Sequence, residues 1–241
     1  MGRGSWSWQI PSQTFYHSGQ HHRLRDHSQC DWNTTRVPDL PNYSGFVISG
    51  SHFSVNDPHE WIRNLERFVL QLNEFNQNNK DIKPVKLFGI CYGHQLIAKA
   101  FGGVVKPNSK GKFIFGAERI ELNKEIYSKK WYQEIFHDTT HFNIMQSHGE
   151  EVSKIPTNAK NVGKSLNCSN EALAYGDNIL TFQGHPELTF DKLSKIIGER
   201  LLRNGKLTDT EHNIAIARAK EVDSSSLTSM ILRFLKPQKN Y

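Results

Sequence analysis

The strongest constraint on the fold is a cysteine that stands between an apolar strand pattern and an apolar helix pattern, in the segment VKLFGICYGHQLIAKAF. The run VKLFGI is typical of a buried β-strand, and HQLIAKAF has the spacing of a short helix that ends at Gly102 and Gly103. Gly89 and Gly93 flank Cys91 and allow the backbone to bend there without side-chain clashes. The segment therefore predicts a strand, a tight turn at Cys91 and a helix.

A cysteine at such a turn is well placed for nucleophilic chemistry. The arrangement is similar to the nucleophile elbow that other hydrolases build around serine, and it exposes a strained, reactive side chain. The positive end of the helix dipole lies next to Cys91 and favours the thiolate over the thiol. An isolated cysteine is nevertheless more often a small buried apolar residue than a catalytic group. The catalytic interpretation therefore requires partners elsewhere in the chain.

Such partners occur in the segment FQGHPEL, which follows the strand pattern NILTFQ and contains His185 and Glu187. A thiolate nucleophile needs a base that also protonates the leaving amine, and the base needs a carboxylate that fixes its tautomer. Pro186 restricts the backbone between the two residues, and we expect both side chains to point the same way along an extended segment. Taken alone, the segment favours an ordinary turn after a strand over a catalytic pair.

The rest of the chain alternates strand and helix patterns. GFVIS and FIFGAERIEL are two further strand patterns, and the first ends in a turn at Gly50 and Ser51. Asp57, Pro58 and Glu60 have the order of a helix N-cap and first turn, and apolar residues follow them at helical spacing. Further helices are predicted over residues 190–203, 208–221 and 224–235. The alternation predicts an α/β fold with three layers, in which a mostly parallel central sheet carries helices on both faces.

The length of 241 residues suffices for one α/β domain with a full hydrophobic core. We expect a single domain over residues 31–241, preceded by a poorly ordered polar leader over residues 1–30. The leader contains four histidines but no cysteine or carboxylate at metal-ligand spacing, which favours a solvated tail over a metal site.

Composition and charge exclude several classes of protein. No apolar run approaches the roughly 18 residues that a membrane span needs, and the opening MGRGSWSWQI lacks the features of a secretory signal, so a cytoplasmic location is expected. The cysteines Cys30, Cys91 and Cys168 are odd in number and have no metal or redox spacing, which predicts reduced thiols. The net charge of +6 is scattered along the chain, and this favours a solvated basic surface over nucleic-acid binding.

Together these motifs resemble the class I glutamine amidotransferase family, which is marked by a Gly-x-Cys-x-Gly-x-Gln elbow and a Gly-His-Pro-Glu segment. In this chain the two motifs are residues 89–95 and 184–187. The resemblance includes the SGS turn at residues 49–51 and the MQSHGEEV stretch at 145–152, and it covers about residues 43–190. It implies the three-layer, flavodoxin-like α/β fold of that family.

The resemblance also implies a catalytic triad. Cys91 would be the nucleophile, His185 the base, and Glu187 the partner that orients the base. The implied reaction is hydrolysis of a γ-glutamyl amide bond through a γ-glutamyl thioester. It releases glutamate and requires no metal and no organic cofactor.

Further contacts with the substrate follow from the same resemblance. The oxyanion hole would combine the backbone N–H of Tyr92 with one from the turn at Gly50 and Ser51. The residues that would hold the α-amino and α-carboxylate ends of the glutamyl group are Gln95, Ser147 and His148.

Within the family, the chain is similar to the stand-alone γ-glutamyl peptidase branch, which cleaves glutathione or its conjugates. The similarity lies in GFVISGS, in Asp57 and in the pair Trp61 and Ile62. A basic run is a candidate to attract the additional carboxylate of a tripeptide substrate, although such a run is more often a solvated loop. It consists of Lys106, Lys110 and Lys112.

Two other functions remain open. Because the 241 residues leave no room beyond the amidotransferase fold, we expect no fused synthetase, and a glutaminase subunit that delivers ammonia to a separate synthetase is an alternative. It is further compatible with a non-catalytic scaffold that retains the fold. Two departures from the family pattern bear on activity. His52 stands where relatives usually carry proline, and residues 1–30 offer only Trp6, Trp8 and Ile10 in place of the first apolar strand of relatives.

Overall fold

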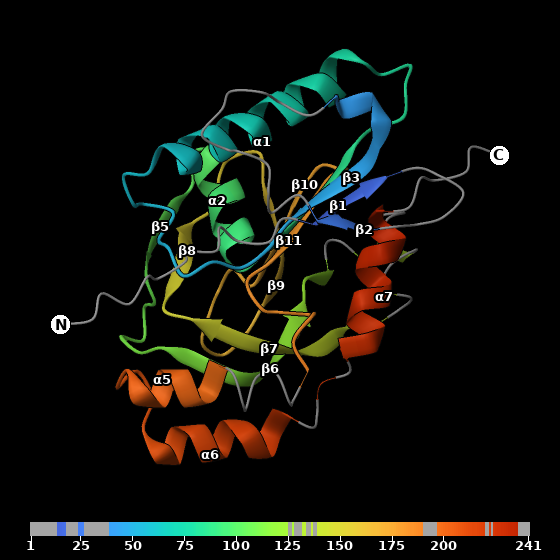
Figure 1. Ribbon diagram of the computed structural model, residues 1–241. Coiled ribbons are helices and arrows are strands. Elements are labelled where there is room, and N and C mark those ends of the chain that lie inside the picture. The colour runs from blue at the N-terminus through green and yellow to red at the C-terminus, as the bar shows by residue number, and fades with distance from the viewer. Residues whose placement is uncertain are drawn as a thin grey trace.

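The computed structural model describes residues 39–124, 127, 132–133, 136, 139–189, 197–219, 222 and 224–235, together with the backbone of 14–17 and 24–26. Within these residues the principal strands are β1 (Thr14–His17), β2 (Leu24–Asp26), β3 (Tyr43–Ile48), β4 (Lys86–Ile90), β6 (Ile114–Leu122), β7 (His141–His148), β9 (Lys160–Lys164), β10 (Ala172–Tyr175) and β11 (Ile179–Phe182). They form one sheet in the order β2-β1-β3-β4-β11-β10-β9-β6-β7 (Figure 1). A second, smaller sheet pairs β5 (Val104–Pro107) with β8 (Glu150–Lys154).

The centre of the large sheet is parallel. Strand β4 lies between β3 and β11 and runs parallel to both, with Leu87 opposite Phe46 on one side and Ile179 on the other. The pairs on the flanks, such as β1 with β3 and β10 with β11, are antiparallel. The predicted α/β fold is confirmed, and its parallel part consists of the three central strands. Because parallel strands end at the same edge of a sheet, their last residues mark one edge. These residues are Ile48, Ile90 and Phe182.

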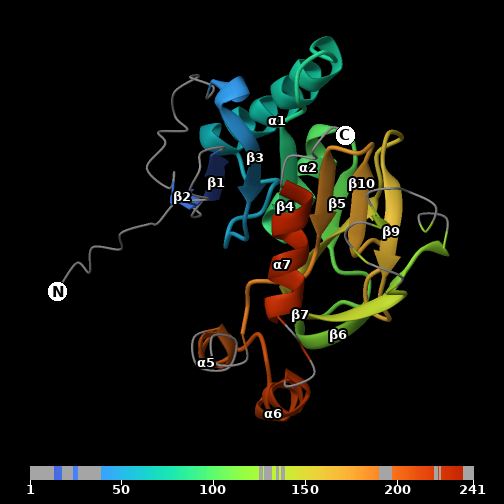
Figure 2. The same ribbon diagram turned by 90° about the vertical axis from the view of Figure 1, so that its right-hand side faces the viewer.

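Both faces of the central strands are buried, and successive residues enter different cores. In β3, Phe46 and Ile48 pack into a core with α1 (Glu60–Asn78) and α2 (Tyr92–Ala100), whereas Val47 enters the core on the opposite face. That opposite face is covered by α7 (Ser224–Leu235), as Figures 1 and 2 show. The alternation follows from the two-residue period of a strand, and burial on both faces explains the continuous apolar runs in the sequence.

Helix α1 begins later than its sequence signals indicate. The prediction places the N-cap at Asp57 and Pro58 in the first turn, but the helix starts at Glu60 with His59 as its N-cap residue. Asp57 instead accepts a hydrogen bond from the backbone N–H of Ser54 at 2.9 Å. Because the carboxylate of Asp57 closes this preceding turn, it does not cap the helix.

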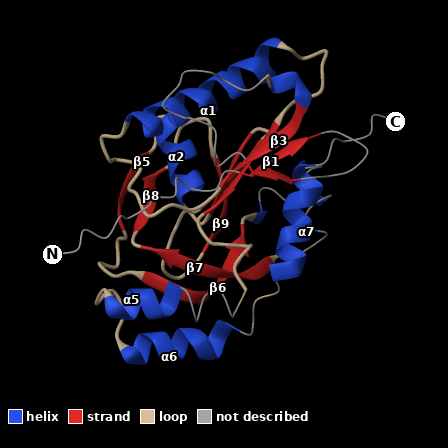
Figure 3. Cartoon of the chain, viewed as in Figure 1, coloured by secondary structure: helices blue, strands red, loops and turns tan. Residues whose placement is uncertain are grey.

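Two of the C-terminal helices lie beside β6 and β7, where Figures 1 and 3 show α5 (Glu199–Arg203) and α6 (Asp209–Arg218). Of the helix predicted over 190–203, residues 190–196 lie outside the described residues. Helix α6 starts where the sequence predicts because a capping box fixes its first turn. The Thr208 hydroxyl accepts a hydrogen bond from the Glu211 N–H at 3.2 Å, and the Glu211 carboxylate accepts one from the Thr208 N–H at 2.9 Å.

Two short strands, β1 and β2, fall within the segment predicted as a polar leader. Strand β1 pairs antiparallel with β3, with Phe15 opposite Phe46, and β2 pairs with β1. Only the backbone of these strands is described, so the side chains of the leader, including its histidines, lie outside the described residues. Strands β1 and β2 therefore continue the large sheet outward from β3.

Candidate active site

Cys91 lies at the turn between β4 and α2, as predicted. Among the described non-glycine residues it alone has a positive φ, with φ +51° and ψ −100°. This conformation is strained for a residue that carries a Cβ atom, and strain of this kind is concentrated at functional sites. The Cys91 N–H donates to the carbonyl oxygen of Phe182 at 2.8 Å. The turn is thus fixed to the end of β11, at the edge where the parallel strands end.

Two glycines allow α2 to pack directly against the strands. A Cβ atom at Gly93 would lie 2.1 Å from the carbonyl oxygen of Ile48, and one at Gly89 would lie 2.8 Å from Cδ1 of Ile97. Neither glycine has a positive φ. The sequence interpretation, that glycine at these positions lets the backbone bend without side-chain clashes, agrees with this packing, since a Cβ atom at Gly89 would also lie 2.9 Å from the carbonyl oxygen of Gly93 across the turn. Cys91 itself takes up the bend, and the glycines permit the close approach of helix and strands.

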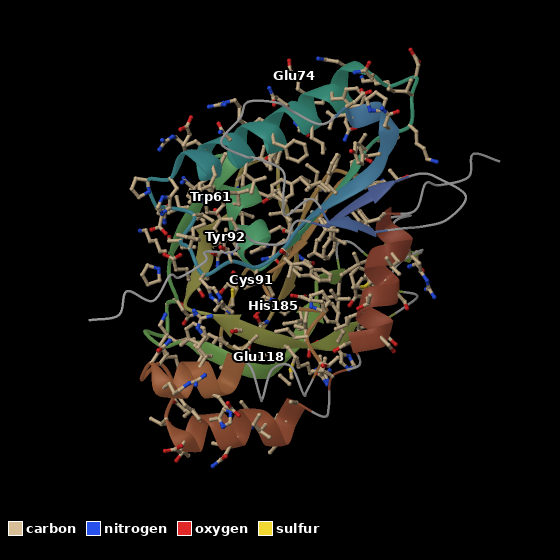
Figure 4. The ribbon with its side chains drawn as sticks, in the orientation of Figure 1. Trp61, Glu74, Cys91, Tyr92, Glu118 and His185 are labelled. Atoms are coloured by element: carbon tan, nitrogen blue, oxygen red, sulfur yellow. The ribbon has the colours of Figure 1, made fainter. Side chains whose placement is uncertain are left out.

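His185 and Glu187 meet in the turn that follows β11. The His185 N–H donates to the carbonyl oxygen of Met145 at 2.7 Å, which connects the turn to β7, and His185 Nδ1 lies 2.7 Å from Oε1 of Glu187. The Leu188 N–H donates to the His185 carbonyl oxygen at 3.3 Å, so this segment is a turn rather than the extended stretch that was expected. In Figure 4, Cys91 and His185 lie next to each other.

The charge state of His185 reflects these neighbours. Burial acts to lower its pKa, but the charges of Cys91 and Glu187 and hydrogen bonds to both raise it more, so the pKa of His185 lies well above its ordinary value. A Cβ atom at Gly50 would lie 2.7 Å from His185 Cε1, which shows that the loop after β3 packs on the imidazole. An imidazole that holds a proton beside a cysteine sulfur is the arrangement that Cys-His nucleophilic chemistry requires.

Cys91 lines a cavity of about 600 Å³, a volume typical of small-molecule sites. The Cys91 thiol lies 3.9 Å from the carbonyl oxygen of Ser147 on its wall. Tyr92 is the first residue of α2, so its backbone N–H has no acceptor within the helix. Several residues that the sequence analysis assigned to the oxyanion hole or to substrate binding line this cavity. They are Ser51, Tyr92, Gln95, Ser147 and His148.

Gln95 connects three segments of the chain around the site. Its Nε2 donates to the carbonyl oxygen of Glu150 at 2.8 Å and to Oε1 of Gln183 at 3.1 Å. The side chain therefore joins the elbow helix to β8 and to the segment between β11 and His185. This network fixes the relative positions of the segments that carry Cys91 and His185.

His148 is a buried neutral histidine in the same wall. Burial is the main cause that lowers its pKa to about 4, the hydrogen bond to Glu150 opposes this, and the charge of His185 adds to it. Its Nδ1 lies 3.0 Å from the Glu150 carbonyl oxygen and therefore carries the proton. The buried Nε2 has no hydrogen-bond partner within the described part of the chain. The lone pair of this nitrogen is therefore buried and unpaired within these residues.

Three charged residues of the cavity wall were not found from the sequence: Glu150, Arg200 and Lys206. Glu150 directly follows His148 and Gly149 in the MQSHGEEV stretch, so the motif itself contained a signal. Arg200 lies in α5 and Lys206 in the turn after it, where the sequence has no motif. The basic run predicted to attract a substrate carboxylate does not line the cavity. It consists of Lys106, Lys110 and Lys112.

Other candidate features lie away from this cavity. Burial raises the pKa of Cys168, which is not part of the cavity wall, and Cys30 lies outside the described residues. Among the residues described, no group of three or more histidine, cysteine or acidic side chains is arranged to hold a metal ion. The described helices are all too short or too polar to cross a membrane.

The fold and the strained cysteine at the strand ends are those of a class I glutamine amidotransferase. The sequence profile described as "Glutamine amidotransferase class-I" matches residues 13–204. The chain therefore belongs to this family, and the resemblance inferred from the motifs is confirmed.

The similar proteins agree with this membership. γ-Glutamyl peptidase 4 of Arabidopsis thaliana is 31% identical over 217 residues, which cover 86% of this chain and 82% of that protein. γ-Glutamyl peptidase 2 of the same plant is 32% identical over 217 residues, with 88% and 81% covered. A crystal structure of a glutamine amidotransferase from Thermotoga maritima has a TM-score of 0.58 at 21% identity, with 81% of this chain and 77% of that chain covered. This last likeness shows the fold.

Proposed function

We propose that this chain hydrolyses γ-glutamyl amide bonds as a stand-alone, cytoplasmic γ-glutamyl peptidase, with glutathione-type compounds as substrates. One observation carries the proposal: Cys91, in its strained turn, lies beside His185, whose Nδ1 is 2.7 Å from Glu187. The names of the two plant relatives support a γ-glutamyl peptide as the substrate. The chemistry described below needs no metal and no organic cofactor.

In the first proposed step, the Cys91 thiolate attacks the γ-carbonyl carbon of the substrate while His185 holds a proton. The carbonyl oxygen becomes an oxyanion. It accepts hydrogen bonds from the backbone N–H of Tyr92 and from an N–H of the turn at Gly50 and Ser51. These donors stabilise a charge that is absent from the bound substrate, and they therefore lower the barrier.

The tetrahedral intermediate then collapses. His185 gives its proton to the leaving nitrogen, the C–N bond breaks, and the γ-glutamyl group remains on Cys91 as a thioester. A water molecule loses a proton to His185 and attacks the thioester carbon, which breaks the S–C bond and releases glutamate. Glu187 accepts the Nδ1–H of His185 throughout and stabilises the imidazolium.

The glutamyl group is proposed to bind through the polar wall of the cavity. Neutral His148 has a free lone pair on Nε2 that accepts a hydrogen bond from the α-ammonium group. Glu150 contributes a negative charge to the same wall, where its Oε1 accepts a hydrogen bond from the Ser54 hydroxyl at 3.1 Å. Ser147 and Gln95 complete the contacts with the glutamyl ends.

The test is glutamate release by the purified protein and by Cys91→Ala, with glutamine, glutathione and a glutathione conjugate supplied separately. The proposal predicts release from the peptides that depends on Cys91. Cys168→Ala is the matched control, since it removes a thiol away from the cavity and should retain the activity. Iodoacetamide should also label Cys91 much faster than Cys168.

The other outcomes identify the alternatives. Release from glutamine alone, increased by a synthetase partner, would indicate a glutaminase subunit that supplies ammonia in trans. No release from any of the three compounds, with equally slow labelling of both thiols, would leave only a non-catalytic scaffold.

A further inference from the structure

The cavity is lined by more charge than the glutamyl group requires. Besides Glu150, two cations line it, Arg200 from α5 and Lys206 from the turn that follows. Both side chains are solvent-exposed and therefore lie at the mouth of the cavity. The volume of about 600 Å³ leaves room for the group on the amine side of the scissile bond.

Neither cation is neutralised by a carboxylate within the part of the chain that is described. The guanidinium Nη1 of Arg200 donates to Nε2 of His52 at 3.0 Å, and Lys206 Nζ lies 5.6 Å from the centroid of the Phe113 ring. Both contacts hold a cation in place without cancelling its charge. Arg200 still has other N–H groups that can donate to a planar anion.

His52 is also part of this positive region. Burial lowers its pKa, and the charges of Arg200 and Lys206 lower it further, so the imidazole is neutral and accepts the Arg200 hydrogen bond. A proline at this position, as expected in relatives, has no side-chain acceptor. The hydrogen bond to His52 therefore fixes one guanidinium nitrogen of Arg200 at the cavity wall.

We propose that Arg200 and Lys206 form a leaving-group subsite that binds a carboxylate on the amine side of the scissile bond. This inference rests on the proposed γ-glutamyl hydrolysis, and it names the property that separates peptide substrates from glutamine. A γ-glutamyl peptide with a free C-terminal carboxylate places an anion beyond the scissile nitrogen, whereas glutamine has only ammonia there. The subsite is distinct from the basic run at Lys106, Lys110 and Lys112, which does not line the cavity.

The experiment compares glutathione with its C-terminal glycinamide analogue, since the two differ only in the carboxylate. The wild-type protein should have a kcat/KM about fivefold higher for glutathione, which corresponds to the roughly 1 kcal/mol expected for an exposed ion pair. The difference should lie in KM, because the contact is made before and during the reaction. The difference in kcat/KM between the two substrates should decrease when the salt concentration is raised from about 0.01 M to about 1 M, because salt screens the ion pair.

Two variants locate the effect. Arg200→Gln combined with Lys206→Gln should bring the kcat/KM ratio of the two substrates close to one. Lys110→Gln removes the same charge from an exposed loop away from the cavity and should keep the fivefold ratio. A ratio near one in the wild-type protein, or a ratio that survives the double substitution, would overturn the subsite.

A binding measurement separates this inference from the proposed function. In the Cys91→Ala protein, calorimetry should show tighter binding of glutathione than of the glycinamide, whether or not the chain turns over either compound. Equal binding of the two would refute the subsite even if hydrolysis is observed. Preferential binding without hydrolysis by the wild-type protein would support the subsite and contradict the proposed catalysis.

Discussion

One added methyl group, in Gly50→Ala, should displace His185 while the fold is retained. The three atoms nearest to the new Cβ all belong to the His185 ring, with Cε1 at 2.7 Å, Nε2 at 3.6 Å and Nδ1 at 3.7 Å. The φ of Gly50 is not positive, so the backbone accepts alanine without strain. The conflict is therefore confined to the imidazole.

The size of the effect follows from these distances. Ordinary van der Waals contact begins near 3.4 Å, so the ring has to withdraw by about 0.7 Å. A catalytic group that is misplaced by about 1 Å costs roughly 100-fold in rate, and the expected fall in kcat/KM is therefore about 10- to 100-fold. In free energy of activation this is roughly 1.4–2.7 kcal/mol. Overpacking should lower the free energy of unfolding by only about 1 kcal/mol, or a few degrees in Tm.

The assay combines glutamate release, iodoacetamide labelling of Cys91 and thermal unfolding. The matched control is Gly102→Ala. Gly102 has φ +89° and no atom within 4 Å of an added Cβ, so alanine there strains the backbone by about 1–2 kcal/mol without touching the site. The control should lose stability but keep its kcat/KM. If Gly50→Ala retained activity within about threefold of the wild type, His185 would not depend on this contact and the reasoning would be refuted.

Two further predictions concern ionisable residues. Glu187→Gln should lower kcat/KM by about 10- to 100-fold, less than the roughly 10⁴-fold loss for a buried triad aspartate, because the Glu187 side chain is 44% exposed. Loss of its charge lowers the pKa of His185, so the alkaline limb of the pH-rate profile should move to lower pH; an unchanged profile would contradict this role. Burial raises the pKa of the Glu171 carboxyl to about 8, although a hydrogen bond from Ser165 acts to lower it. The protonated Glu171 therefore contributes fully to folding stability below about pH 4.5, and this contribution is lost as the pH rises through 8. Denaturation at a series of pH values should show a loss of roughly 3–5 kcal/mol that is absent in Glu171→Gln, and parallel curves for the two proteins would rule this out.

The elements that the sequence predicts correctly are those in which one local pattern decides the structure. Strands β3, β4 and β11 read as continuous apolar runs because both of their faces are buried. The start of α1 was misplaced because Asp57, a good N-cap residue by type, is used by the turn at Ser54. The antiparallel direction of the flanking strands could not be predicted from local sequence patterns, since it depends on how the chain connects distant segments.

In the candidate site, too, the residues predicted from the sequence are those that belong to a local motif. Cys91, His185 and Glu187 were found because their motifs pair residue type with a turn. Arg200 and Lys206 reach the cavity that Cys91 lines from a segment about 110 residues further along the chain, with no pattern apart from helical spacing. Gly89 and Gly93 prevent side-chain clashes at the bend, as the sequence predicts, but their second role, the close packing of α2 on the strands, appears only in three dimensions.

The two sides of the site depend on different kinds of contact. The proposed nucleophile and base are held by backbone hydrogen bonds, Cys91 N–H to Phe182 and His185 N–H to Met145, which follow from the order of the strands. The cations at the mouth are held by side-chain contacts of Arg200 with His52 and Lys206 with Phe113. If both proposals hold, substitution at the mouth should change the preference for the leaving group without disturbing the strand ends that carry Cys91 and His185. In the proposed subsite, His52, which stands where proline was expected, contacts Arg200 through its side chain, a contact that proline could not make.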